Sequence, residues 1–456
     1  MSENPLGTEK ISKLLRSFAV PSITATLVSS LYNIVDQVFI GQGVGYLGNA
    51  ATNVSYPLST ICLAISLLLG IGSASRFSLC LGRKEPERAA ALAGNGVVLM
   101  AAAGLLYLLV GEAFLPQLLR VFGATAEVMP LARQYAGVTL VGMPFLILTN
   151  GVSNLIRADG SPRYSMACMV AGAIANTILD PIFIFGFHWG VFGAALATVL
   201  GQVLSFFLAI RYLWLFRTVR LTKACFRLDL RDALRTMYMG TSSCLNQVAI
   251  TIVQIVLNNS LTYYGALSVY GTDIPLAACG IVMKTNAILL SIIVGISQGV
   301  QPIIGYNYGA GRYDRVKQAY MLAIKWNLAV SGVGFCLFQF FPRQIIAIFG
   351  TGDPLYFDFA VLFMRTFLFM VLVNGVQLLS SNFFTAIGKA MKGLLLSLTR
   401  QVFFLIPLIL ILPLWLGVFG VLLAGPIADF IAFVVSVLLV RRQFKLLDAQ
   451  AASARA

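Results

Sequence analysis

The sequence contains little charge. Asp, Glu, Lys and Arg make up 11% of its 456 residues, whereas a soluble globular protein carries roughly 25%. So few charges cannot cover the surface of a soluble protein of this size. Hydrophobic residues, at 59%, are too abundant for a disordered chain. The composition therefore predicts an integral membrane protein.

The motifs of the common catalytic and nucleotide-binding sites are also missing. The sequence has one histidine, His188, and no HExxH or GxxxxGK[ST] motif, so we expect neither a metal-dependent hydrolase nor an ATP-driven pump. Gly43–Gly48 matches GxGxxG but follows no strand, which argues against a dinucleotide site. The seven cysteines are scattered without a CxxC pair. We expect no enzyme activity and no bound cofactor.

Long apolar stretches fill the chain. Each is long enough to cross a bilayer, which takes about 20 residues, and a lipid-exposed backbone must satisfy its hydrogen bonds internally. We therefore predict twelve transmembrane helices. They cover residues 14–40, 50–80, 91–115, 127–156, 163–185, 190–216, 236–265, 275–305, 316–341, 354–385, 391–414 and 418–440.

The basic residues predict the orientation of these helices. Of the 32 Lys and Arg residues, 24 fall in the even-numbered loops and the two tails, whereas the odd-numbered loops hold only Arg120, Arg133 and Arg343. Cytoplasmic loops carry the excess of Lys and Arg, so we expect a multi-pass protein of the plasma (inner) membrane with both termini in the cytoplasm. The net charge of +15 then indicates anionic membrane lipids as neighbours and not nucleic acid.

The second half of the chain repeats the first. Adding 227 to the residue number carries Phe122-Gly123 onto Phe349-Gly350 and Gly190–Gly193 onto Gly417–Gly420. Two six-helix units that enter the membrane from the same side are parallel repeats, an architecture of alternating-access transporters. We predict an all-α membrane fold with two lobes related by a pseudo-twofold axis. Residues 1–216 form the N-terminal lobe, 217–235 a cytoplasmic linker and 236–456 the C-terminal lobe with a short tail.

Three acidic residues lie well inside predicted helices: Asp36, Asp180 and Asp429. Each costs about 2.5–3.5 kcal/mol at a helix centre. Asp36, Asp180 and Thr198 lie near helix ends on the same side of the membrane, and Asn176 precedes Asp180 by one turn. We predict that these four form an oxygen-rich cage for Na⁺ or a proton. The alternative is that hydrogen bonds satisfy Asp36 and Asp180 separately.

The repeat makes this cage a property of one half only. The same offset carries Asp36 onto Tyr263 and Asp180 onto Pro407, so the N-terminal lobe would hold the coupling site. Pro21 lies inside the first helix and permits a bend. A bend linked to the state of Asp36 and a static kink both fit the sequence.

Polar residues of the second half are candidates for the wall of a substrate cavity. Lys284 interrupts the eighth helix too far from its ends to reach water easily. Interhelical hydrogen bonds are the alternative role for the seventh-helix amides, and an ion pair with Arg400 is the alternative for the acid of the twelfth helix. The candidates are Gln254, Asn258, Met283, Lys284 and Asp429.

Five segments, spread over essentially the whole chain, resemble the multidrug and toxic compound extrusion (MATE) family in its bacterial drug-efflux branch. They are NIVDQVFIGQGVGYLGNAATNVSYPLSTICLAISLLLGIGSAS, RADGSPRYSM, ANTILDPIFIFG, GVFGAALATVLGQ and SQGVQPIIGYNYGAGRYDRV. The resemblance implies two six-helix lobes in a V around a central cavity. It also implies antiport, in which inward flow of Na⁺ or H⁺ drives export of cationic amphipathic compounds. Asp36, Asn176, Asp180 and Thr198 match the family's N-lobe cation site, and Pro21 its bending proline.

The second lobe departs from the family pattern. Some members carry an acidic residue in the seventh or eighth helix, where this chain offers Gln254 and Lys284. We therefore expect a cation-coupled multidrug exporter that couples through its N-terminal lobe and works as a monomer. Two alternatives remain: a flippase for lipid-linked precursors, and an intramembrane hydrolase that uses Asp36 and Asp180 as a catalytic dyad.

Overall fold

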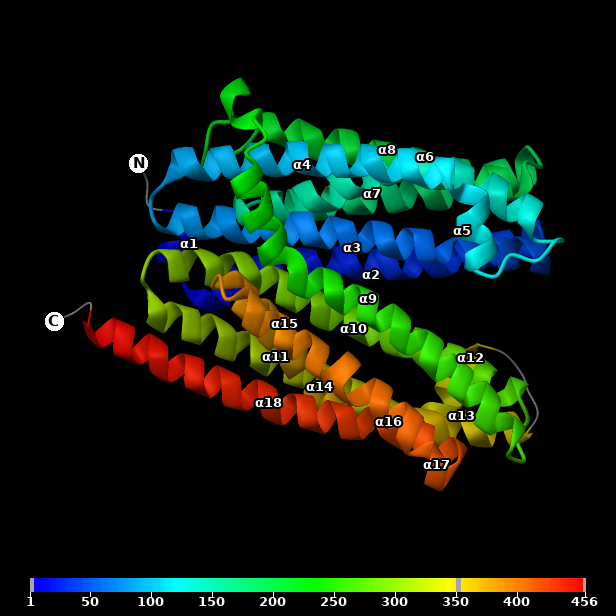
Figure 1. Ribbon diagram of the computed structural model, residues 1–456. Coiled ribbons are helices and arrows are strands. Elements are labelled where there is room, and N and C mark those ends of the chain that lie inside the picture. Colours follow the sequence, from blue (N-terminus) through cyan, green and yellow to red (C-terminus); the bar gives the residue numbers. More distant parts are fainter. Residues whose placement is uncertain (1–3, 350–353, 454–456) are drawn as a thin grey trace.

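The structure, a computed structural model, describes residues 4–349 and 354–453, and these ranges contain helices and no β-strand (Figure 1). The helices of the first half, together with the short turns of the α8–α9 connection, are α1 (Pro5–Thr8), α2 (Ile11–Gly43), α3 (Tyr46–Gly82), α4 (Pro86–Ala113), α5 (Leu115–Val121), α6 (Met129–Ala158), α7 (Pro162–Pro181), the π-helix η1 (Ile182–Gly186), α8 (Gly190–Arg211), η2 (Tyr212–Trp214) and η3 (Lys223–Phe226).

The second half repeats this order. Its helices are α9 (Leu230–Ala266), α10 (Asp273–Gly309), α11 (Tyr313–Phe340), α12 (Pro342–Ile348), α13 (Pro354–Phe367), α14 (Val371–Ala386), α15 (Ala390–Leu398), the π-helix η4 (Thr399–Leu405), α16 (Ile406–Ile411), α17 (Pro413–Leu416) and α18 (Val418–Ser453). The bounds of α5, shifted by 227, are the bounds of α12. A π-helix interrupts the fifth span of each half. The repeat predicted from sequence is therefore present in three dimensions.

The twelve predicted spans are confirmed, with two differences of detail. In the described ranges, eleven helices are long and apolar enough to cross a membrane, and α13 and α14 form the remaining span as a pair bent by 48°. The second difference concerns the linker. Its residues 230–235 are already helical, because Asp229 caps the start of α9 by accepting from the backbone N–H groups of Arg231 and Asp232.

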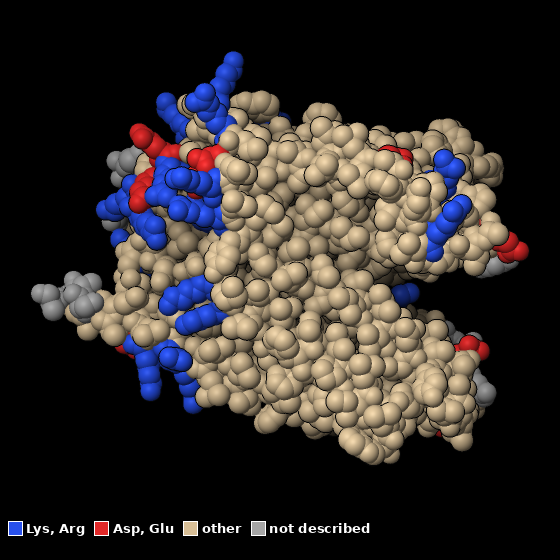
Figure 2. Space-filling view, in the orientation of Figure 1, with Lys and Arg blue, Asp and Glu red and all other residues tan. Residues whose placement is uncertain are grey.

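The helices form two lobes arranged as a V. The lobes meet at the end that holds both described ends of the chain and separate towards the opposite end (Figure 1). Figure 2 shows the surface hollowed between the lobes at that opposite end, which we call the open end. It also shows that Lys and Arg gather at the other end, which we call the basic end. The predicted two-lobe, V-shaped fold is confirmed.

Helix α2 belongs to both lobes. Its first turns, including Leu15 and Phe18, are buried in a cluster formed mostly by α10, α11 and α14 of the second half. Its last turns are packed in the first half, where Ile40 contacts Ile184 and Ala194. Pro21 is buried between these two regions, and the helix continues without a break across it. A movement of one lobe relative to the other must therefore act on α2.

Glycines close the basic end by bringing helices of different lobes into backbone contact. A Cβ placed on Gly240 of α9 would lie 1.7 Å from the carbonyl oxygen of Leu68 in α3, and one on Gly72 would lie 2.1 Å from that of Thr236. Next to this contact, Arg76 forms an ion pair with Asp232 at 2.5 Å and donates to the Thr236 hydroxyl at 3.1 Å. The two lobes are therefore in direct contact at the basic end and separated at the open end.

Candidate functional site

The carboxyl groups of Asp36 and Asp180 lie within hydrogen-bonding reach of each other. Asp36 comes from α2 and Asp180 from the last turn of α7, two helices that pack side by side. Asp180 is fully buried, and Asp36 Oδ1 is buried without a hydrogen-bond donor among the described residues. The structure thus brings the two predicted acids together at one place in the first lobe.

Asn176 connects this pair to α8. Its amide nitrogen donates to Asp180 Oδ2 at 3.3 Å, and its amide oxygen accepts from the backbone N–H and the hydroxyl of Thr198 at 3.2 Å each, in the orientation that satisfies both ends of the amide. Asn176 and Asp180 share a face of α7 because they are four residues apart. All four residues predicted to form the cage therefore lie together.

The site contains two tyrosines that the sequence analysis missed. Tyr32 of α2 and Tyr135 of α6 both lie close enough to interact electrostatically with Asp36 and Asp180. Tyr32 precedes Asp36 by four residues, so helical spacing could have revealed it. Tyr135 stands on a helix far away in the sequence, and no local pattern connects it to the acids.

Asp180 lies where the hydrogen-bonding pattern of its helix changes. Pro181, the next residue, has no N–H to donate to the backbone of the preceding turn, and the chain widens into the π-helix Ile182–Gly186 directly afterwards. Insertions of this kind re-aim side chains and are frequent at functional sites. The Asp180-Pro181 dipeptide thus sets the carboxyl group at the junction of two helical forms.

Basic side chains of the described residues do not compensate the charges of Asp36 and Asp180. Among the described residues, no Lys or Arg pairs with Asp36 or Asp180, and no group of three His, Cys, Asp or Glu side chains lies together. Two adjacent carboxylates without a basic partner repel one another, so one proton or one monovalent cation relieves the repulsion. Oxygen ligands of this kind suit a hard cation, and a shared proton suits a carboxyl pair.

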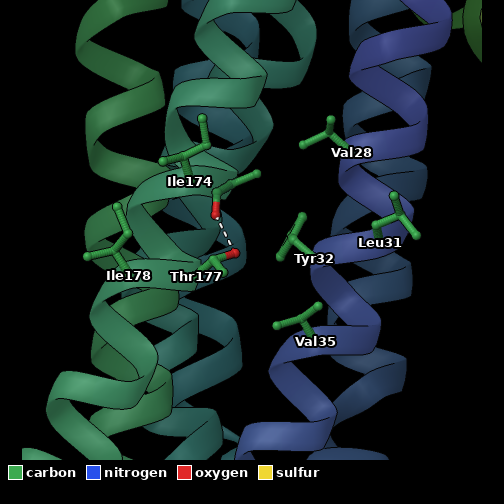
Figure 3. Close-up of a pocket in the computed structure, with 8 residues that line it drawn as sticks. Val28, Leu31, Tyr32, Val35, Ile174, Thr177 and Ile178 are labelled. Carbon is green, nitrogen blue, oxygen red and sulfur yellow. Dashed lines mark hydrogen bonds between the residues drawn. The ribbon is translucent and has the colours of Figure 1, made fainter.

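An apolar groove of about 270 Å³ lies beside the site, between α2 and α7. Figure 3 shows Val28 and Val35 of α2 pointing towards α7. Leu31 of α2 and Ile174 and Ile178 of α7 also line the groove. Its polar lining residues are Tyr32 and Thr177, and the Thr177 hydroxyl donates to a backbone carbonyl of its own helix at 2.9 Å. The groove lies on the side of α2 opposite the side that packs on α10, so it is distinct from the opening between the lobes.

The candidate residues of the second lobe fall into different environments. Asp429 is 4% exposed and forms an ion pair with Arg400, which is the structural alternative stated for it. Met283 packs against the core of the second lobe. Gln254 donates to Asn258 at 3.0 Å, and both remain partly exposed. Lys284 is exposed.

The comparisons with known proteins identify the family. A family model described as MatE matches residues 21–182 and 242–411. The chain belongs to the MatE family. It is 28% identical over 435 residues to the multidrug export protein MepA of Staphylococcus aureus (strain N315), a match that covers 94% of this chain and 93% of MepA. It is 24% identical over 397 residues to the probable multidrug resistance protein YoeA of Bacillus subtilis (strain 168), covering 84% of each.

Solved structures of MatE relatives share the fold. An outward-facing multidrug resistance MATE family transporter of the MOP superfamily superimposes with a TM-score of 0.92 at 23% identity, over 98% of this chain and 99% of that chain. A MATE structure in a bent conformation gives a TM-score of 0.89 at 24% identity, over 97% of each chain. This chain is thus a multi-pass membrane protein with the architecture of MATE transporters.

Proposed function

We propose that the protein is a secondary active multidrug exporter of the plasma (inner) membrane. Inward movement of Na⁺ or H⁺ through the Asp36–Asp180 site drives outward movement of cationic amphipathic compounds, and the basic end faces the cytoplasm. The named relatives support drug export, since MepA is a multidrug export protein. The positive-inside rule supports the orientation, because Lys and Arg gather at the basic end. With this orientation the hollow between the lobes opens to the outside.

The observation that carries the antiport mechanism is the uncompensated carboxyl pair. The second lobe also buries an acid, Asp429, but there Arg400 supplies the positive charge. At Asp36 and Asp180 the described part of the chain supplies none. A buried pair without a counter-charge has to take a cation or a proton from outside the protein.

Helix α2 offers a physical connection between this site and the lobes. Asp36 lies in the part of α2 that is packed in the first lobe, whereas the turns before Pro21 are packed in the second lobe. Binding a cation or proton at Asp36 changes the charge on one side of Pro21, where the helix is free to bend. A bend there shifts one lobe relative to the other and so favours release of cargo.

The test is gradient-driven transport in proteoliposomes. Purified protein is reconstituted, and efflux of a fluorescent organic cation is followed under a sodium gradient and, separately, under a proton gradient. We expect one gradient to drive efflux in the wild type and Asp180→Asn to abolish it at unchanged expression and melting temperature. Asp273→Asn, at an exposed acid in the first turn of α10, is the matched control and should transport normally.

Each outcome decides a different point. The gradient that drives efflux names the coupling ion. Normal pumping by Asp180→Asn would show that coupling occurs elsewhere. Absence of gradient-driven movement in the correctly folded wild type would contradict antiport and favour the flippase alternative.

A further inference from the structure

Lys284 faces the first lobe across the opening. Further towards the basic end, the same face of α10 packs on α2: a Cβ on Gly295 would lie 2.5 Å from Ile23 Cα, and Ser291 hydrogen-bonds Ser30 at 2.5 Å. Lys284 precedes Gly295 by close to three turns of an α-helix and Ser291 by close to two. It therefore continues the α2-facing surface of α10 into the region where the lobes have separated.

The exposure pattern along α10 locates the start of the opening. Ser291 and Gly295 are buried against α2, whereas Lys284, on the same face, is exposed. No acidic side chain of the described residues pairs with Lys284. Ionisable residues inside spanning helices usually face a water-filled cavity and mark substrate or ion pathways, and Lys284 faces such an opening.

Helix α9 adds amide groups to the same wall. Gly240 packs on Leu68 of α3, and Gln247, Gln254 and Asn258 follow Gly240 by close to two, four and five helical turns. Because these intervals are nearly whole turns, the three residues lie along the face of α9 that is turned towards the first lobe. Asn258 Oδ1 accepts from Gln254 at 3.0 Å and from Cys279 Sγ of α10 at 3.7 Å, and all three amides remain partly exposed. The second lobe thus presents hydrogen-bonding groups and one fixed cation to the opening.

The opposite wall combines aliphatic side chains of α3 with amide side chains of α2. On α3, Ile61 and Val54 precede Leu68 by close to two and four helical turns and continue the face that packs on α9; Ile61 is 43% exposed. Asp36 and Asp180 do not supply negative charge to this wall, because they face one another inside the first lobe. On α2, Asn33 and Gln37 follow Thr26 and Ser30 by close to two helical turns and continue the face that bonds Ser291 of α10. The opening therefore places apolar and amide side chains of the first lobe opposite one positive charge that no described acid pairs with.

We propose that Lys284 binds a carboxylate on the cargo, so that among cationic amphipathic compounds those that also carry a carboxylate are preferred. The apolar body of such a compound packs on the α3 wall, its anionic group pairs with Lys284, and the amide oxygens of α9 lie towards its cationic centre. The inference deepens the proposed export function and rests on it. A charge-assisted contact of this type is equivalent to about a tenfold change in affinity.

Two dyes that differ by one methyl group test this assignment. Tetramethylrhodamine has a free carboxylate, and its methyl ester is a cation of nearly the same shape. Binding of both is measured by fluorescence polarisation in detergent, and transport of both in proteoliposomes. The proteins are wild type, Lys284→Met, Lys284→Arg and the control Lys325→Met. Lys325 is an exposed lysine of a spanning helix, α11, on the side opposite its buried residues.

We expect the wild type, Lys284→Arg and Lys325→Met to bind the free acid about tenfold more tightly than the ester. Lys284→Met should lose this preference by weakening acid binding alone, with ester binding unchanged. Equal affinities in the wild type, or an equal loss of both dyes in Lys284→Met, would overturn the assignment. Tighter, Lys284-dependent binding of a short-chain phosphatidic acid would assign the site to a lipid headgroup and also overturn the cargo.

The two readouts separate this inference from the function on which it rests. Polarisation reports whether Lys284 selects the carboxylate, whether or not the protein pumps. Selective binding without gradient-driven transport of either dye would contradict the exporter. Transport of both dyes without any preference for the acid would contradict the role of Lys284 alone.

Discussion

Replacing Gly240 by alanine should shift the protein away from the conformation described above. The missing side chain of Gly240 lets α9 lie directly on the backbone of α3, and a Cβ there would be 1.7 Å from the Leu68 carbonyl oxygen. An ordinary van der Waals contact begins near 3.4 Å, so the two helices must move apart or the contact must break. Because this contact joins the two lobes, it opposes opening of the basic end.

The size of the effect follows from this overlap. Over-packing of a close contact costs about 1–3 kcal/mol, and the cost disappears in any state in which α3 and α9 have separated. The ratio of the two conformations should therefore change by about 5- to 150-fold in favour of the state that is closed at the open end. Overall stability should fall less than this, because the variant can escape the overlap by changing conformation.

Spin labels at the open end measure the shift. Arg120 of α5 and Arg343 of α12 are exposed residues of different lobes near that end. With cysteines at both positions, in a background that lacks the native cysteines, the inter-label distance should shorten in Gly240→Ala. The control is Gly280→Ala in α10, where a Cβ meets nothing within 4 Å. Unchanged distances in Gly240→Ala, or the same shift in the control, would refute the reasoning.

Two further predictions concern the ion pairs. Asp232→Asn removes the charge opposite Arg76 and should shift the conformational equilibrium by about 1 kcal/mol in the same direction as Gly240→Ala. The same inter-label distance measures this shift. A distance distribution like that of the wild type would contradict a role for this ion pair in holding the basic end closed. Asp429→Asn leaves Arg400 buried without its partner and should destabilise the protein by about 3–5 kcal/mol, measured as a lower melting temperature in detergent. The double variant Arg400→Met, Asp429→Leu should recover most of this loss, and a double variant that melts as early as the single one would argue that the pair is not what stabilises the second lobe.

The number of spans was predictable because each apolar run is long enough to cross the bilayer and is bounded by polar residues or turns. The break in the tenth span was not. The bend between α13 and α14 falls at Leu368, Phe369 and Met370, a stretch without proline or glycine, so no local signal marks it. Packing against neighbouring helices has to produce this bend.

The candidate cation site was predictable for a similar reason. Membrane insertion makes an acid inside a span expensive, so Asp36 and Asp180 stood out in the sequence, and the spacing of Asn176 placed it beside Asp180. Tyr135 could not be found in this way, because it reaches the site from α6. The environment of Asp429 was left as two alternatives, and the position of Arg400 on a neighbouring helix favours the ion pair.

By itself the sequence determined the membrane location, the twelve spans, the internal repeat and the short list of polar residues inside the helices. These properties follow from local composition, periodicity and self-similarity. Only the tertiary structure decided that α2 is shared between the lobes, that glycines lock the basic end, and that Lys284 stands in the opening while Asp429 is neutralised. The physical reason is that charge compensation and helix contact depend on residues that are distant in the chain, and an amino-acid sequence lists side chains without stating which of them meet.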